Sequence, residues 1–449
     1  MKLKQLYERI ELKGDNAGHV SIWSREDDSI VIVRYAERGN VTNQIANYES
    51  IDISGKSTLI PFTLEKAKEV LKRISNGRQY SSSYIFYNGD YLKDLNMMKT
   101  EMEHKYTSTG IKFWKHQQAM LNYKNDDPNS IVSSHISPEG ACNLSCSYCS
   151  VTHRDTHSRI DLNVIKDYVI KLQSRGLKAV ILTGGGEPLA YPHANELINW
   201  LKYERGLDIG LITNGTLTKK LDDNALKSFS WVRVSINIFK DWEKRIRLPA
   251  DKLSPECIVG ASMVYTTEHE ATEENETDRM TIFSKVKAVV DTFGAKYIRI
   301  LPNCLLDQEH LFLMHRAIDY TLKELGDDRF FHQHKVHGAP SCSTCHQAYF
   351  RPYLSEEPFH ANGIPGTVYP CDSVVLNETY QFFAKKYQIC HASDILDFLD
   401  RKIKMQFDPR KDCKGCVFTD NINLLDRWKT QGIERFNEFK EPLLHENFV

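Results

Sequence analysis

Several features are scarce or missing in this 449-residue chain, and each absence narrows the possible functions. No apolar run approaches the roughly 20 residues that a membrane-spanning helix needs, so we expect no membrane partner. The opening stretch, MKLKQLYERIELKGD, has no apolar segment of the kind found in signal peptides, so we expect a cytoplasmic protein. The formal net charge of −1 gives no overall attraction to polyanions. No internal repeat or low-complexity tract is visible.

Cysteine is absent from the first 123 residues, and eleven cysteines follow. In a reducing compartment such a set favours metal binding or catalysis over disulfides. The stretch KNDDPNS is polar and contains proline, which predicts a linker at 124–130. We therefore expect an N-terminal α+β domain for substrate recognition over residues 1–128. This expectation is based on β-like runs at 20–24 and 29–35 and on a helical pattern at 63–75.

Beyond the linker, apolar runs alternate with helical stretches, which predicts an α/β fold with six β/α repeats and a parallel sheet. In such folds functional residues gather at the carboxyl ends of the strands. The expected strands are 131–137, 179–183, 208–213, 231–238, 257–265 and 296–302.

Three cysteines, Cys142, Cys146 and Cys149, follow the first of these runs. Thiolates so close in sequence can converge on one metal site from a single loop. A zinc site would need a fourth ligand to complete its tetrahedron. An iron–sulfur cluster held by three thiolates instead leaves one iron for an external ligand. On this motif alone, both metals remain open.

The CxxxCxxC spacing, with Tyr148 before the last cysteine, resembles the signature of the radical S-adenosylmethionine (radical SAM) superfamily. The motifs TGGGEP, TNG and SIN end the second, third and fourth expected strands and are similar to its other motifs. The resemblance covers roughly residues 131–302 and implies a partial (β/α)6 barrel over 129–305. It also implies S-adenosylmethionine (SAM) contacts at Gly184, Gly185, Gly186, Glu187, Asn214, Ser235, Asn237 and Val264.

The resemblance assigns a role to each of these groups. The three glycines and Glu187 correspond to the loop at the methionine end of SAM, with Glu187 facing the α-ammonium. Ser235 and Asn237 correspond to the ribose contacts, although many members have Asp where Asn237 stands. The fifth strand, with Val264, corresponds to the adenine site.

The same resemblance implies the cofactors and the chemistry. The three cysteines would hold a 4Fe–4S cluster whose open iron binds SAM. A one-electron donor such as flavodoxin or ferredoxin would allow reductive cleavage to a 5′-deoxyadenosyl radical. That radical would abstract hydrogen from a substrate, as in an oxidoreductase or isomerase.

Six of the eleven cysteines lie beyond residue 306. The run GTVYPC resembles the GX4C element of SPASM and twitch domains, which add auxiliary clusters to radical SAM barrels. We expect such a domain over 306–420, followed by a helical tail over 421–449. One auxiliary 4Fe–4S cluster is expected on Cys345, Cys371, Cys413 and Cys416.

The other cysteines have alternative interpretations. Cys342 could replace Cys345 in the auxiliary cluster. A structural zinc held by the pairs CSTC and CKGC also remains open. Cys390 is expected to be a buried spare thiol, and Cys304 follows the sixth strand at the rim where function is expected.

Three function classes follow. Radical SAM proteins with this C-terminal extension resemble enzymes that oxidise, crosslink, epimerise or rearrange a peptide, so a peptide is the leading substrate. The N-terminal domain would then bind it by strand addition. A radical SAM enzyme that modifies a nucleic-acid base, with a nucleobase substrate, is the alternative. A non-catalytic iron–sulfur or zinc interaction protein is the third.

Overall fold

The computed structural model describes most of the chain beyond residue 100 and the strands before it. The described residues are 3–12, 18–25, 30–37, 58–62, 84–88, 101–266, 276–306, 308–334, 338–377, 385–431 and 443–449. They fall into two compact units. The smaller comprises Met1–Lys99 with Leu306–Leu313, and the larger comprises Thr100–Leu305 with Met314–Val449. No helix among the described residues is both long and apolar enough to cross a membrane.

The smaller unit contains a five-stranded sheet in the order β1-β2-β3-β5-β4. The expected runs at 20–24 and 29–35 are confirmed as β2 and β3, which pair antiparallel. The helix expected over 63–75 lies outside the described residues. The strands are β1 Leu3–Leu12, β2 Gly18–Arg25, β3 Ile30–Glu37, β4 Thr58–Phe62 and β5 Tyr84–Asn88.

The larger unit is built on a ten-stranded sheet in the order β12-β11-β10-β9-β8-β7-β6-β13-β14-β15. The six expected strands are confirmed as β6 to β11, and each pairs parallel with the next. Most of their residues are buried, which is why their sequences read as apolar runs. They are β6 Ser133–Ile136, β7 Ala179–Leu182, β8 Asp208–Thr213, β9 Trp231–Ser235, β10 Ile258–Tyr265 and β11 Tyr297–Pro302.

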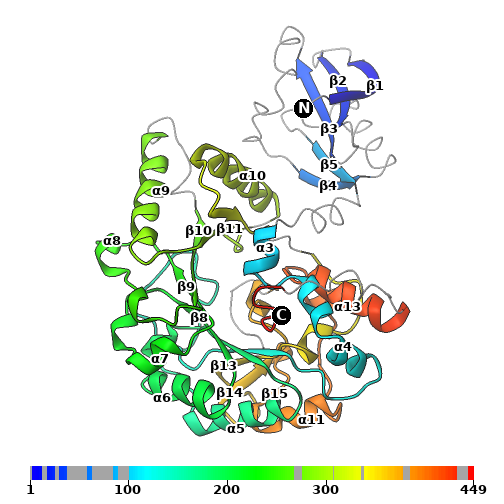
Figure 1. Cartoon of the computed structure of the whole chain (residues 1–449). Helices are drawn as coiled ribbons and strands as arrows, with labels where there is room; N and C mark the ends of the chain where they lie inside the picture. Colours follow the sequence, from blue (N-terminus) through cyan, green and yellow to red (C-terminus); the bar gives the residue numbers. More distant parts are fainter. Residues whose placement is uncertain are drawn as a thin grey trace. The chain divides into compact units, whose positions relative to one another are not determined.

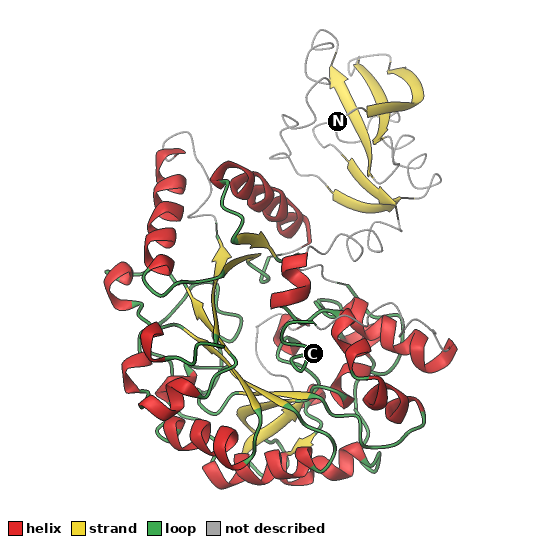
Figure 2. Ribbon diagram, viewed as in Figure 1, coloured by secondary structure: helices red, strands yellow, loops and turns green. Residues whose placement is uncertain are grey.

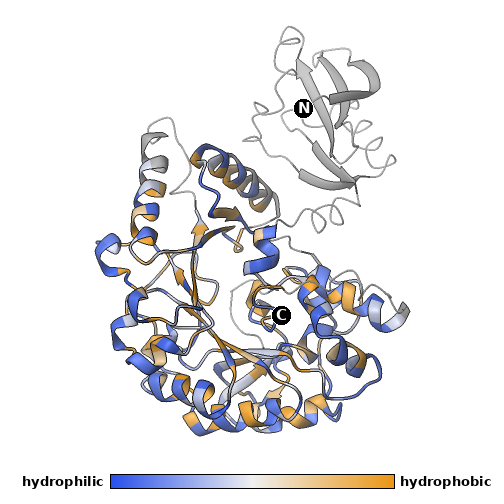
Figure 3. Cartoon of the chain, in the orientation of Figure 1, coloured by the Kyte–Doolittle hydropathy of each residue, from blue (hydrophilic) through white to orange (hydrophobic). Residues whose placement is uncertain are grey.

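A helix follows each of these strands and lies on the outside of the sheet (Figures 1 and 2). This is the open β/α barrel that the sequence predicted. Figure 3 shows hydrophobic residues gathered in the strands and along the sides of the helices that face them. The helices are α5 Leu162–Gln173, α6 Ala194–Asn199, α7 Asp223–Lys227, α8 Trp242–Arg245, α9 Glu276–Asp291 and α10 Gln308–Leu325.

Four strands extend this sheet beyond the expected six. β12 Phe330–His332 pairs parallel with β11 at one end. At the other end β13 Tyr353–Pro358 pairs parallel with β6, and it starts an antiparallel meander. The cysteine-rich region is therefore hydrogen-bonded directly to the strand that precedes the three-cysteine loop. The meander is completed by β14 Pro365–Tyr369 and β15 Cys390–His391.

Short helices before and after the barrel complete the larger unit. The stretch expected as a linker follows one of them, and there Asp126 pairs with Lys429 at 2.5 Å and with Arg401 at 3.2 Å. Near the last residue, Phe448 packs against Trp231 at the start of β9, with ring centroids 5.4 Å apart. The domain boundaries expected within this unit remain predictions. The helices are α3 Glu101–Tyr106, α4 Gln117–Lys124, α11 Ile395–Leu399, α12 Pro409–Asp412 and α13 Thr419–Gln431.

Candidate active site

The three-cysteine loop follows β6. Cys142, Cys146 and Cys149 are all half-buried. Burial raises the pKa of the Cys142 and Cys146 thiols, and the neighbouring thiols raise it further. Arg154 lies against the loop, with Nη1 3.6 Å from Cys149 Sγ and Nε donating to the carbonyl of Gly140 at 2.7 Å. Three thiols from one loop therefore lie close together beside a guanidinium that can offset thiolate charge.

The TNG turn after β8 is tied to this cysteine loop. Asn214 Nδ2 donates to Asn143 Oδ1 at 2.9 Å and lies 4.0 Å from Cys142 Sγ. Asn143 Nδ2 in turn donates to Thr216 Oγ1 at 2.7 Å. Asn214 thus lies beside the cysteine loop and positions it, while its contact with SAM remains a prediction.

The glycine loop after β7 packs directly on the residues that lead into the cysteines. Gly185 N donates to Ser137 Oγ at 2.6 Å, and Gly186 N donates to the carbonyl of Glu139 at 2.9 Å. A Cβ on Gly186 would lie only 2.1 Å from the carbonyl oxygen of Ala141. Glycine is therefore required here by the protein's own backbone, in addition to the ligand approach that the sequence suggested.

Glu187 is 3% exposed, and both of its carboxylate oxygens already have partners in the protein. Oε1 accepts from Thr213 Oγ1 at 2.6 Å and from Leu189 N at 3.2 Å, and Oε2 accepts from Asn214 N at 2.8 Å. Burial raises the pKa of this carboxyl group. The carboxylate thus joins the glycine loop to the β8 turn. Its contact with the ammonium of SAM remains a prediction.

The ends of β9 and β10 lie beside the cysteine loop. The Tyr148 hydroxyl donates to Asn237 Oδ1 at 2.7 Å, and Asn237 Nδ2 donates to the carbonyl of Ser235 at 3.3 Å. Tyr148 and Val264 both line the same cavity. The structure therefore brings together the SAM-contact residues named from sequence, while their individual contacts with SAM remain predictions.

That cavity has a volume of about 270 Å³ and extends from the strand ends into the barrel. Sequence reasoning missed the cations of its wall. Lys105 is already paired with Glu101, and the others are a lysine and three arginines: Lys112, Arg233, Arg299 and Arg351. One acidic side chain, Asp372, is among the described residues that line it. The sequence did offer a sign of two of these cations, because each of the mainly apolar runs WVRVS and YIRIL has an arginine at its centre.

Little negative charge offsets these cations in the part of the chain that the structure describes. Arg299 Nη1 donates to the neutral Gln333 Oε1 at 2.8 Å, and Arg351 comes no closer than 3.9 Å to Asp372. Among the described residues, the buried atoms Arg299 Nε and Arg351 Nη2 have no hydrogen-bond partner. A buried N–H group without a hydrogen bond is costly, so an anion that enters this cavity can accept the hydrogen bonds that these two groups do not make within the protein.

The pKa values in the cavity reflect the same imbalance. Burial and the nearby Arg233 charge lower the pKa of Lys112 to about 7. The same two causes lower the pKa of Arg299 to about 9. A bound anion would reverse both shifts, because an opposite charge favours the charged form of each group.

The structure gathers the four cysteines expected to bind the auxiliary cluster. Burial and neighbouring thiols together raise the pKa values of Cys345, Cys371 and Cys413, and Cys416 is one of those neighbours. The amide of Phe418 donates to Cys416 Sγ at 3.4 Å. Such N–H···S contacts tune the potential of a bound cluster.

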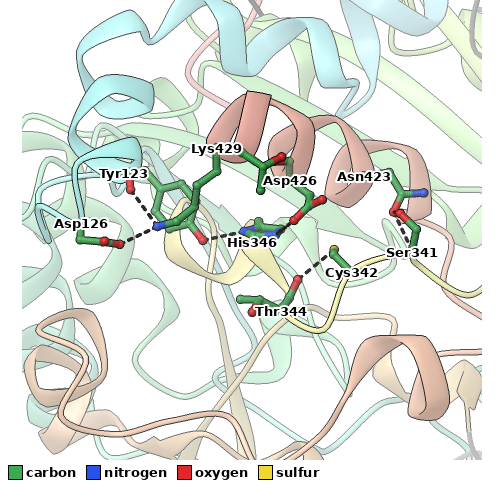
Figure 4. A network of polar contacts seen from close by, with 10 residues as sticks. Tyr123, Asp126, Ser341, Cys342, Thr344, His346, Asn423, Asp426 and Lys429 are labelled. Carbon is green, nitrogen blue, oxygen red and sulfur yellow. Dashed lines mark hydrogen bonds and ion pairs between the residues drawn. The ribbon is translucent and has the colours of Figure 1, made fainter. Parts of the chain in front are cut away.

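Figure 4 shows Cys342 in a network of polar contacts with residues of α4 and α13. Its thiol donates to the carbonyl of Thr344 at 3.4 Å and shares a cluster with His346 and Asp426. The Tyr123 hydroxyl contacts His346 Nδ1 at 2.7 Å. This geometry favours Cys345 for the auxiliary cluster and does not favour a zinc site made of two CxxC pairs.

Two further cysteines named from sequence, Cys390 and Cys304, have different surroundings. Cys390 is buried in β15, where burial raises the pKa of its thiol, as expected for a spare thiol. Cys304 lines the cation-lined cavity at the end of β11.

Comparison with known proteins identifies the barrel. Residues 136–252 match the model of the Radical SAM superfamily, so this part of the chain is a radical SAM domain. The superfamily uses a 4Fe–4S cluster and SAM. The matched range contains the three-cysteine loop, the glycine loop and the β8 and β9 turns.

Curated relatives match over part of their length. An S-adenosylmethionine-dependent nucleotide dehydratase of Selenomonas ruminantium is 34% identical over 86 residues, which are 19% of this chain and 30% of that protein. A probable GTP 3',8-cyclase of Methanocaldococcus jannaschii is 34% identical over 113 residues, 24% of this chain and 36% of that protein. The chain therefore spans about a third of these relatives.

Among solved structures, Streptococcus suis SuiB bound to S-adenosylmethionine aligns with a TM-score of 0.43 and 12% identity. The alignment covers 79% of this chain and 84% of that chain.

Proposed function

We propose that this radical SAM enzyme removes a hydrogen atom from an anionic substrate held in the cation-lined cavity. One observation carries the proposal. The cavity is bordered by Tyr148 of the cysteine loop and also contains Lys112 and three arginines. A site for radical formation and a site for an anion therefore adjoin at the carboxyl ends of the barrel strands, where α/β folds bind their ligands.

The residues after β6, β7 and β8 fit the cofactors of the superfamily. Three thiols on one loop suit a cluster that keeps one iron open, and the loop has no fourth cysteine to close a zinc site. When bound, the cluster and SAM supply a 5′-deoxyadenosyl radical that takes the hydrogen atom. Arg154 and Asn214 place N–H groups toward the thiols, and Tyr148 and Asn237 hold the loop against β9.

The buried Cys345, Cys413 and Cys416 and the half-buried Cys371 fit one auxiliary 4Fe–4S cluster. Val417 and Phe418, which follow Cys416, line the same cavity. We propose that a flavodoxin or ferredoxin supplies the electron for radical formation. The auxiliary cluster would then accept or relay the electron that the substrate loses in an oxidation.

A peptide is the first substrate candidate, for oxidation, crosslinking, epimerisation or rearrangement. A cavity of about 270 Å³ accommodates one side chain more readily than a folded segment. The cations would select an aspartate, a glutamate or a terminal carboxylate. The N-terminal sheet ends in β1 and β4, and either edge strand could add a strand of the peptide.

A nucleotide or nucleobase is the second candidate, and the cavity charge specifically favours it. Arginine recognises phosphate through paired N–H donors, and two buried arginine nitrogens here make no hydrogen bond among the described residues. The curated relatives are named for a nucleotide and for GTP. A phosphate and a carboxylate are both anions that cavity arginines can bind, so the test must distinguish a nucleotide from an acidic peptide.

The test uses anaerobically reconstituted protein, in which the two clusters predict about seven or eight iron atoms per chain. Formation of 5′-deoxyadenosine is measured with nucleoside phosphates, acidic peptides, and the matching nucleosides and amidated peptides. Only the anionic member of a pair should stimulate turnover. Arg299→Gln should raise the KM of that substrate at least tenfold, while Arg245→Gln on the exposed side of α8 should leave it unchanged.

Stimulation by nucleotides alone would establish the second candidate, and stimulation by peptides alone would establish the first. Equal stimulation by the neutral analogues would refute the role of the cavity cations. Protein that binds only zinc, or that forms no 5′-deoxyadenosine after reduction with SAM, would instead support a non-catalytic binding protein.

A further inference from the structure

Three histidines and two carboxylates meet at the free end of the large sheet, away from the cysteines. His332 belongs to β12, His334 follows it, and Asp319 lies on α10. His332 Nδ1 is 2.6 Å from Asp319 Oδ1, and His334 Nε2 is 4.0 Å from Asp319 Oδ2. The ligand atoms of all three residues lie within 4.8 Å of one another. This spacing is close to that of donor atoms around a single metal ion.

The local backbone explains why these side chains converge. Alternate residues of an extended strand point to the same side, so His332 and His334 face α10 while Gln333 faces the cavity. His315 and Asp319 are four residues apart and share one face of α10. α3 packs against β12 and brings Glu103 to the same place.

The outer nitrogens of both candidate histidine ligands also have partners. His334 Nδ1 lies 3.9 Å from Glu103 Oε2, and this carboxylate is 1% exposed. His332 Nε2 lies 2.6 Å from His315 Nδ1. Metal-binding histidines almost always use the second ring nitrogen in this way, because the contact fixes the ring and its tautomer.

Charge balance favours a cation at this site. His332 is 5% exposed, so its ring lies away from solvent. The carboxylates of Asp319 and Glu103 lie beside His332 and His334, at 2.6 Å and 3.9 Å. A divalent ion neutralises both charges and uses lone pairs that are already directed at one point.

We propose that Asp319, His332 and His334 form a zinc site that fastens β12 to α10 and α3. Two nitrogens and one carboxylate oxygen suit zinc, and a water molecule would complete the tetrahedron. The ion would hold the end strand in place and, through Gln333, the guanidinium of Arg299 at the cavity wall. This site does not depend on the proposed substrate.

The test measures zinc in the reconstituted holoprotein after incubation with micromolar zinc and removal of unbound metal. About one zinc per chain is expected, with only nitrogen and oxygen neighbours at about 2.0–2.1 Å in the zinc X-ray absorption spectrum. Zinc at the cysteine sites would instead show sulfur at about 2.3 Å. Asp319→Asn and His334→Ala should each lose this zinc while the iron content stays the same, and His193→Ala, an exposed control, should retain it.

Thermal unfolding gives an independent readout. Added zinc should raise the unfolding midpoint of the wild type and the control but not that of Asp319→Asn, whose amide preserves the shape of the side chain. Two results would overturn the proposal: a wild type without zinc at nitrogen and oxygen ligands, or zinc that persists in both variants. In either case the cluster would be a histidine–carboxylate hydrogen-bond network.

Discussion

Glu356 offers a stringent test of the packing beneath the glycine loop. It lies on β13, is fully buried, and a Cβ on Gly185 would come within 1.8 Å of its Oε1. Burial raises the pKa of Glu356 from 4.5 to about 7, although hydrogen bonds from Ser137 and the Glu356 amide oppose the shift. Glu356→Gln keeps the shape of the neutral acid and removes the titration.

The sign and size of the effect follow from that pKa. The folded protein holds the proton more tightly than the unfolded chain, so stability falls as pH rises from 4.5 and levels off above 7. At about 1.4 kcal/mol per pKa unit, ionisation costs about 3 kcal/mol above pH 7, of which about 2 develops between pH 5.5 and 8.5. The neutral amide of the Glu356→Gln variant would not carry this cost.

The assay is urea unfolding of the anaerobic protein across that pH range, with the wild type and Glu356→Gln compared at each pH. The stability difference should move in favour of the variant by about 2 kcal/mol from the acidic to the alkaline limit. A pH-independent part of this difference would reflect the amide itself, so only the change of the difference with pH is compared with the expected value. Glu196→Gln, on the exposed face of α6, should change stability by less than about 1 kcal/mol. Parallel pH profiles for Glu356→Gln and the wild type would refute the reasoning.

Four further predictions concern the iron sites. Cys146→Ala should abolish SAM cleavage, and persistent 5′-deoxyadenosine would refute its role as a ligand. Cys413→Ala should retain cleavage and lose product, and full product formation would show that the auxiliary cluster is dispensable. Cys345→Ser should lose about four iron atoms while Cys342→Ser loses none, and equal iron contents would contradict their separation. Tyr148→Phe removes one hydrogen bond and should raise the KM for SAM about fivefold, and an unchanged KM would contradict this role.

The barrel was accessible from sequence because its strands are buried on both sides. Runs such as AVIL and DIGLIT have few polar residues, so their number and order could be read directly. β12 is only three residues long, and β13 reads YLSEEP, where two glutamates obscure an otherwise buried strand. Neither carries a pattern that distinguishes it from a loop.

The site could be predicted only where its residues are close together in the sequence. The cysteine and glycine motifs are continuous, and their strand-end positions followed from the alternation of elements. The cation-lined cavity draws on Lys112, Arg233, Arg299 and Arg351, which are separated by up to 239 positions (351 − 112) and meet only after folding. The spacing of the cysteines in the sequence is equally compatible with Cys342 and with Cys345 as a ligand of the auxiliary cluster. Only the folded structure shows that the two residues have different neighbours.

The parallel pairing of β13 with β6 has a consequence for dissecting this chain. A fragment that ended before residue 338 would lack the segment that covers β6 on one side, together with the carboxyl group beneath Gly185. β6 would become a bare edge directly before Cys142, open to aggregation and unable to hold its loop. The two regions expected to bind iron are therefore joined through one sheet, and we expect the shortened barrel to be unsuitable for studying the first of them in isolation.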